Sequence, residues 1–194
     1  MSAGLFTGIP RDVLGYLQAG TPATSTFYRA NMPRIGLYDS AGDTGSAALA
    51  DGIMTAVRLP LAAGDLVTNL TFISGTATSG TEANWWYALY DTAATSNLIA
   101  QTADQTTGAW ALNTVKTLPL SAAYTVPKTG VYWAACMVAA STAVPSLVGS
   151  IAVRPIVTGE RNLTVNSGTG ITTTATATLA SPAVQNFAPY CVAT

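Results

Sequence analysis

The chain has 194 residues, and only 9% of them are charged, against about 25% in typical soluble domains. Its eight basic residues are scattered and nearly balanced by nine acidic ones, which excludes the clustered Lys and Arg of a nucleic-acid-binding protein. Because a surface so poor in charge favours association, we expect the protein to form homo-oligomers or to join a larger assembly.

Residues 1–33 differ in composition from the rest of the chain. They combine a short helix-compatible piece (Pro10–Leu17) with a polar stretch rich in Thr and Ala, and nothing in them alternates long enough for a core strand. We interpret them as an extended N-terminal docking arm that a partner orders. Its expected anchors are apolar side chains together with two arginines as charge contacts: Leu5, Phe6, Ile9, Val13, Leu14, Leu17 and Phe27, with Arg11 and Arg29.

From residue 34 onward, short runs rich in Val, Ile and Thr alternate with turns that contain Gly, Pro, Asn and Asp. This spacing is typical of all-β proteins and predicts an antiparallel, jelly-roll-like β-sandwich over residues 34–194. Within 66–74, alternation places Leu66, Leu70 and Phe72 on one face. The expected strands lie at 53–59, 66–74, 85–91, 97–103, 115–120, 131–140, 147–157, 162–165, 171–179 and 184–193.

Residues 84–91 read NWWYALYD and form the densest aromatic cluster in the chain. In a strand, Trp86 and Tyr90 share one face, while Trp85 and Tyr87 share the other. Both faces are apolar, which predicts a buried strand packed on both sides. In the alternative interpretation, Trp85, Trp86, Tyr87 and Tyr90 form an exposed platform for a glycan, with polar neighbours at Glu82, Asn84 and Asp91.

The stretch Val131–Val153 is uncharged and long enough for a transmembrane helix. It contains Pro145 and Gly149 in a turn-like region, so we predict two short strands and no membrane contact. Cys136 and Cys191 lie in apolar strand-like runs, where a buried, small hydrophobic residue is the default. A disulfide between them stays open, because it requires the two strands to be neighbours.

Enzymatic motifs are weak or missing in the sequence. There is no histidine, so acid–base chemistry near neutral pH would need another group with a strongly shifted pKa. Asp43-Thr44-Gly45 matches the triplet of aspartic proteases but lies in a loop-like Gly/Ser/Ala tract. The sequence has no phosphate-binding loop, nucleophile elbow, HExxH motif or dinucleotide-binding glycine pattern. We therefore expect no catalytic residues, no cofactor and no metal.

The middle of the chain resembles a β-sandwich module of virion proteins from tailed phages that infect actinobacteria. The resemblance covers roughly residues 57–149 and rests on LPLAAGDLVTNLTF, on the aromatic strand ending in LYD, on TADQTTGAW and on TGVYW. Members of this group are minor tail proteins, head-surface proteins or other virion proteins. The resemblance implies a non-enzymatic structural protein on the virion surface, assembled in the cytoplasm of the host bacterium, and brings no catalytic residues.

A position on the head of the phage fits the sequence better than one on the tail. Tail fibres usually reach outward through a coiled coil, a collagen-like repeat or a β-helix, and the chain has none of these patterns. We therefore expect a capsid decoration (minor head) protein that forms a homo-oligomer, a trimer, and docks on the major capsid protein. The alternative is a minor tail or host-contact protein of the same phage class that binds a glycan.

Overall fold

The computed structural model describes residues 28–33, 37–39, 49–75, 82–106, 109–140, 143–152, 154–160 and 162–194. Within these ranges every helix or strand element is a β-strand. In chain order the strands are β1 (Arg29–Ala30), β2 (Tyr38–Asp39), β3 (Ile53–Leu61), β4 (Leu66–Ile73), β5 (Glu82–Tyr90), β6 (Leu98–Gln101), β7 (Val115–Thr125), β8 (Gly130–Ala140), β9 (Val148–Ile151), β10 (Thr164–Ser167), β11 (Ala183–Val184), β12 (Phe187–Pro189) and β13 (Cys191–Ala193).

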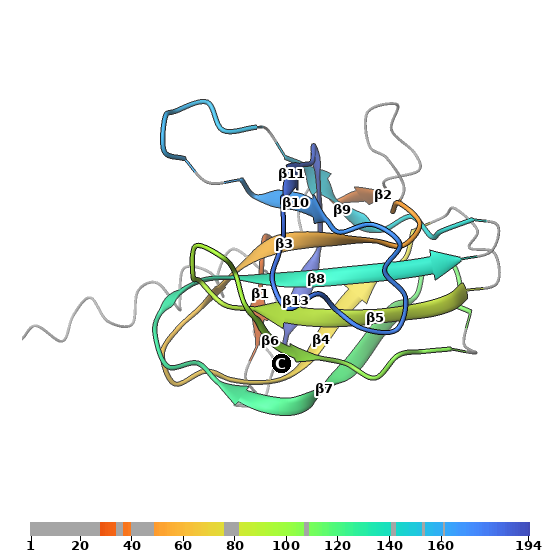
Figure 1. The fold of residues 1–194 in the computed structure, drawn as a ribbon, viewed down its shortest axis with the longest axis horizontal. Helices are drawn as coiled ribbons and strands as arrows, with labels where there is room; N and C mark the ends of the chain where they lie inside the picture. Colours follow the sequence, from red (N-terminus) through yellow and green to blue (C-terminus); the bar gives the residue numbers. More distant parts are fainter. Residues whose placement is uncertain are drawn as a thin grey trace, which may run out of the picture.

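The strands form three antiparallel sheets (Figure 1). A six-stranded sheet has the order β11-β10-β3-β8-β5-β6, a four-stranded sheet the order β1-β13-β4-β7, and a three-stranded sheet the order β12-β9-β2. Every strand pairing is antiparallel. The two larger sheets pack face to face, so the prediction of an antiparallel β-sandwich is confirmed.

The main hydrophobic core lies between the six-stranded and the four-stranded sheet. Side chains alternate between the two faces of a strand, and every second residue of β5 (Trp85, Tyr87 and Leu89) points into this core. From the opposite sheet, Phe72 of β4 packs against Tyr87, with their ring centroids 4.7 Å apart. Burying an aliphatic or aromatic side chain of this size contributes about 1.5–3 kcal/mol, so this interior is the principal source of stability.

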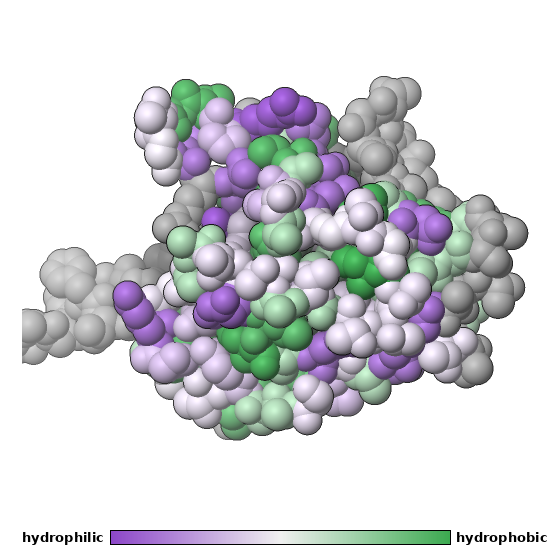
Figure 2. All heavy atoms as spheres, in the orientation of Figure 1, coloured by the Kyte–Doolittle hydropathy of each residue, from purple (hydrophilic) through white to green (hydrophobic). Residues whose placement is uncertain are grey.

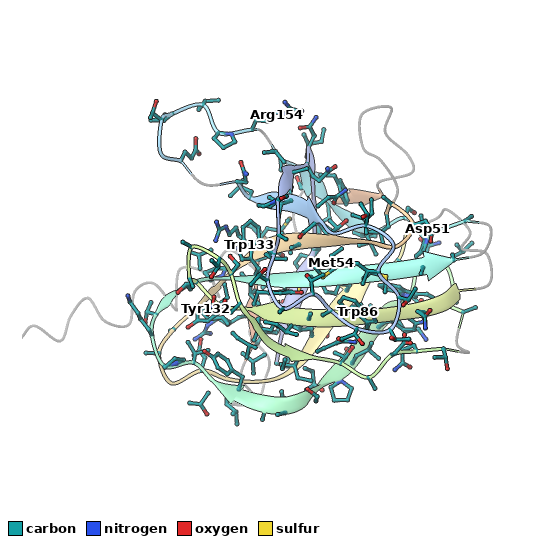
Figure 3. The ribbon with its side chains drawn as sticks, viewed as in Figure 1. Asp51, Met54, Trp86, Tyr132, Trp133 and Arg154 are labelled. Carbon is teal, nitrogen blue, oxygen red and sulfur yellow. The ribbon has the colours of Figure 1, made fainter. Side chains whose placement is uncertain are left out.

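A second core lies on the other face of the six-stranded sheet, beneath residues 171–179, which we call the strap. The strap crosses in front of β3, β8 and β5 (Figure 1) and buries Ile171, Ala175 and Leu179 against the sheet. Figure 3 shows Met54 and Trp86 on the sheet face that the strap covers. The prediction of a strand over 171–179 is wrong, because the strap lies across the strands and forms only an isolated bridge, Asn97 with Thr178.

The prediction that Leu66 shares a face with Leu70 and Phe72 is wrong, because β4 contains a β-bulge between Val67 and Asn69. The bulge shifts the side-chain alternation by one position, so that Val67 is fully buried while Leu66 is 47% exposed. Leu70 and Phe72 do point into the core. Leu66 therefore does not share their face.

The uncharged stretch 131–153 forms two strands, β8 and β9, as predicted. Pro145 lies between them, where a missing backbone N–H costs no ladder hydrogen bond. Across the described part of the chain, we find no helix of the length and apolar character that spanning a membrane would take.

Candidate functional site

The aromatic strand β5 is buried on both faces, so the prediction of a core strand is confirmed. The rings of Trp85, Trp86, Tyr87 and Tyr90 are at most 2% exposed. Trp85 stacks on Trp110 at a centroid distance of 5.2 Å and an interplanar angle of 19°. None of the four rings is available at the surface, so this strand offers no aromatic platform to a glycan, contrary to the alternative interpretation.

The strap is tied to the aromatic strand through side-chain donors. Trp86 Nε1 donates to the carbonyl of Thr172 at 2.6 Å, and the Tyr90 hydroxyl donates to the carbonyl of Thr176 at 2.9 Å. These bonds satisfy the polar ends of two buried aromatic residues. The second face of the strand is therefore covered by the protein's own chain.

The polar residues that would have accompanied a glycan platform have structural partners instead. Asn84 Nδ2 donates to a carboxylate oxygen of Asp104 at 2.6 Å, and the other oxygen accepts the backbone N–H of Trp85. Asp91 accepts the backbone N–H groups of Ala93 and Asn97, which shapes the loop after β5. The side chain of Glu82 and the triplet Asp43–Gly45 lie outside the described residues.

The root of the predicted docking arm is built into the sandwich. β1 pairs with β13, and the Arg29 guanidinium donates two hydrogen bonds of 3.0 Å to the carboxylate of Asp65, which is itself buried. The Tyr28 and Tyr190 hydroxyls lie 3.0 Å apart. Bidentate pairs of this kind fix geometry as well as charge, so Arg29 is held by the body of the protein.

The other predicted anchors of the arm, Leu5, Phe6, Ile9, Arg11, Val13, Leu14, Leu17 and Phe27, lie outside the described residues. Asp65 was missed as the partner of Arg29, because the two are far apart in sequence and Asp65 reads as a turn residue. In the structure, Asp65 closes the short turn after β3, where the backbone N–H of Ala62 donates to Asp65 Oδ2 at 2.8 Å. The sequence signals this turn but not the pairing with Arg29.

A hollow of about 390 Å³ opens on the strap side of the six-stranded sheet. Its lining includes the buried apolar side chains of Trp133, Val165 and Leu179, together with Ala94, Arg58 and Glu160. The Arg58 guanidinium lies 3.6 Å from the centroid of Trp133, a close cation–π contact. Sequence analysis missed this hollow, because its lining comes from five separate segments of the chain.

The charge of Arg58 is already engaged by the protein. Besides its contact with Trp133, its Nε donates to the carbonyl of Asn162 at 3.1 Å. Trp133 in turn donates from Nε1 to the Ser96 hydroxyl at 3.1 Å. The hollow is thus a depression lined by apolar side chains and by polar groups that already have partners within the protein.

Cys136 and Cys191 are free thiols in the main core. Burial raises the pKa of both thiols well above the ordinary value, which makes them poor nucleophiles and poor metal ligands. Among the described residues, we find no cluster of three or more His, Cys, Asp or Glu residues that could hold a metal ion. Both cysteines therefore act in the core as small, packed side chains.

No protein-family model matches the chain, and no curated protein sequence matches it significantly.

Proposed function

We propose that the protein is a non-enzymatic structural protein of a phage particle, and specifically a capsid decoration (minor head) protein. The anchored root of the N-terminal arm is the observation that carries this proposal. A segment that docks on a shell must transmit force to the folded body, and the Arg29–Asp65 pair with the β1–β13 ladder supplies a rigid connection.

The resemblance to virion β-sandwich modules supports the same role. It covers residues 57–149, which run from β3 into β9 and include β4 to β8, the strands that supply most of the main core. The low content of charged residues favours a protein that is largely covered by neighbours. On this proposal the protein forms a trimer and contacts the major capsid protein through its arm.

The two free buried thiols fit assembly in the reducing cytoplasm of a host bacterium, followed by a place on the virion surface. The alternative role, as a minor tail or host-contact protein that binds a glycan, loses its main support with the burial of the aromatic strand. We therefore favour the head.

Immunogold labelling of assembled particles tests the proposal directly. Antibody against the purified sandwich should label the faces of the capsid, and antibody absorbed with the same protein is the control. Gold confined to the tail would replace the decoration role with the alternative, and particles that carry no label in either place would refute both.

A further inference from the structure

Two thiols enter the main core from opposite sheets. Cys136 belongs to β8 of the six-stranded sheet, and Cys191 belongs to β13 of the four-stranded sheet. Both residues are 0% exposed and are part of the same hydrophobic core. Figure 1 shows β13 passing behind β8. The two side chains therefore reach the same layer from opposite sides.

The neighbours of the two cysteines are in contact with each other. Cys136 pairs with Tyr87 of β5, and Cys191 pairs with Phe72 of β4. The rings of Tyr87 and Phe72 meet across the core, with centroids 4.7 Å apart. Residues directly opposed on neighbouring antiparallel strands have their Cβ atoms about 4.5–5.5 Å apart. Each thiol is thus one strand away from a contact that joins the two sheets.

The order of the strands places both thiols on the same side of this contact. β1 lies against β3 at one end of the sandwich, and β7 lies against β5 and β6 at the other end. Between these ends, β4 and β13 of one sheet follow the same order as β5 and β8 of the other. The step from Phe72 to Cys191 and the step from Tyr87 to Cys136 therefore lead toward the same end. This brings the two thiols opposite each other.

The ionisable groups in this part of the core influence one another. Burial raises the pKa of Cys191 well above its ordinary value, and the neighbouring Cys136 raises it further. Burial also raises the pKa of Tyr87, with smaller contributions from both thiols. A like charge disfavours ionisation in this way only at short range. The electrostatics agree with the strand order in placing the two sulfur atoms near each other.

We propose that Cys136 and Cys191 form an inter-sheet disulfide when the chain folds or locally opens in the presence of a small-molecule disulfide such as oxidised glutathione. The thiolate of one cysteine attacks the small disulfide and releases one glutathione thiol. The thiolate of the other cysteine then attacks the protein sulfur of this mixed disulfide and releases the second. The two protein thiols lose two electrons and two protons, and the glutathione disulfide gains them.

The closed sandwich keeps the two thiols apart from an oxidant. Figure 2 shows atoms packed over the face of the six-stranded sheet, and burial keeps both thiols protonated through their raised pKa. The bond therefore forms during folding or opening, and in a reducing compartment the thiols stay free, as they are in the structure. This inference does not depend on the proposed place of the protein on a phage particle.

Refolding in glutathione buffers tests the pair. The urea-unfolded parent is equilibrated with mixtures of reduced and oxidised glutathione, either after dilution into native buffer or still in urea, and is then alkylated and weighed by mass spectrometry. If the fold brings the thiols together, the equilibrium constant for the internal disulfide should be about 30-fold or more higher in native buffer than in urea. An equal or lower constant in native buffer would overturn the inference, and this comparison uses the parent alone.

The melting temperature gives an independent reading of the same bond. The oxidised parent should melt about 5–15 °C above the reduced parent, because the cross-link restricts the unfolded chain. An oxidised form that melts at or below the temperature of the reduced form would show that the native geometry does not accept the bond.

A matched control moves one thiol along β8 and keeps the composition of the chain. Cys136→Ala with Ala134→Cys places the thiol two residues away on the same face, where Ala134 is also a fully buried part of the main core. The shift is about 6.8 Å, whereas the Cβ atoms of a disulfide lie only about 3.5–4.5 Å apart. This variant should gain nothing from native buffer over urea. A gain equal to that of the parent would show that the position of Cys136 opposite Cys191 is not what favours the bond.

Discussion

At the scale of single residues, the aromatic strand β5 supplies both cores. Trp85 and Tyr87 enter the interior between the sheets, while Trp86 and Tyr90 enter the layer beneath the strap. A run of adjacent large aromatic residues is tolerated only where both faces of a strand are covered. This is why the cluster in the sequence identifies the most deeply buried strand of the fold.

Trp86→Ala should destabilise the fold strongly. The change removes a fully buried ring and leaves the carbonyl of Thr172 without its indole donor. Large-to-small substitutions of this kind cost about 3–5 kcal/mol, a large share of the roughly 5–15 kcal/mol that a domain has. Urea unfolding followed by tryptophan fluorescence measures the loss. Trp85→Ala probes the other core in parallel, and parent-like midpoints for both variants would contradict the assignment of β5 to the interior.

Tyr87→Phe should leave the free energy of unfolding unchanged or raise it. The Tyr87 hydroxyl is buried and has no hydrogen-bond partner among the described residues, and an unsatisfied buried polar group costs about 1–3 kcal/mol. Tyr90→Phe is the matched comparison, because it removes the same atom but loses a bond to Thr176. That variant should lose about 0.5–1.5 kcal/mol. A larger loss in Tyr87→Phe than in Tyr90→Phe would count against this account of the two hydroxyls.

At the scale of elements, the sequence predicts those strands whose signals are local. The strand predicted at 131–140 appears as β8 (Gly130–Ala140), because β-branched and aromatic residues run between two clear turns. The bulge in β4 and the path of the strap depend on tertiary contacts instead. In the strap, Thr and Ala alternate as in a strand, yet the buried positions recur every fourth residue: Ile171, Ala175 and Leu179.

The strap should loosen when Gln101 is replaced by Ala. The Gln101 side chain binds the strap at both ends of its amide: Nε2 donates to the carbonyl of Thr173 at 2.8 Å, and Oε1 accepts the N–H of Ala175 at 2.7 Å. Losing both bonds should cost about 1–3 kcal/mol. Hydrogen exchange should show faster exchange of the Ala175 amide.

The control for the strap is Gln105→Ala, since the Gln105 side-chain amide donates locally to the carbonyl of Ala103 and, among the described residues, has no bond to the strap. That variant should leave exchange in the strap at the parent rate. Equal protection of Ala175 in the parent and in Gln101→Ala would show that the apolar side chains alone hold the strap.

At the scale of the whole molecule, stability should decline in alkaline solution. Burial raises the pKa of Tyr90 from 10.0 to about 12, and it raises the pKa of Cys136 and Cys191 above the ordinary 9.0 of a thiol. The folded protein therefore keeps these protons when the unfolded chain has already lost them. The stabilising effect is complete below the ordinary pKa values and falls as the pH rises through them.

Urea unfolding at a series of pH values between 8 and 11 measures this decline. A variant with Cys136→Ala and Cys191→Ala should lose the part of the decline that starts near the ordinary thiol pKa of 9.0 and keep the part due to Tyr90. A parent whose free energy of unfolding stays constant over this range would show that the buried groups do not control alkaline stability.

The candidate sites, like the strands, could be predicted from the sequence only where their signal is local. The arm is predicted from composition, because residues 1–33 lack the alternation of the sandwich, and it stays a prediction because residues 1–27 lie outside the described part of the chain. Two features could not be predicted from the sequence: the pairing of Arg29 with Asp65 and the hollow lined by Trp133. Each joins segments that are distant in sequence. Sites built by long-range packing carry no local pattern.

Deletion of residues 1–27 should abolish incorporation into particles and leave the sandwich folded. The cut must end before Tyr28, because Tyr28 bonds to Tyr190 and the next residues pair with β13. A deletion of residues 1–33 removes this root as well and should lower the melting temperature. Incorporation is measured by mass spectrometry of purified virions, and circular dichroism reports the fold.

The matched control keeps the arm and weakens its root. Arg29→Ala breaks the bidentate pair and leaves the Asp65 carboxylate without the guanidinium that it accepts from. Because one partner of a largely buried charge pair is removed, this variant should lose stability but keep the apolar anchors of the arm. It should therefore still enter particles at a temperature where it is folded. If the protein without residues 1–27 were incorporated at the parent level, the arm would not be the docking element, and the contact with the shell would have to come from the sandwich itself.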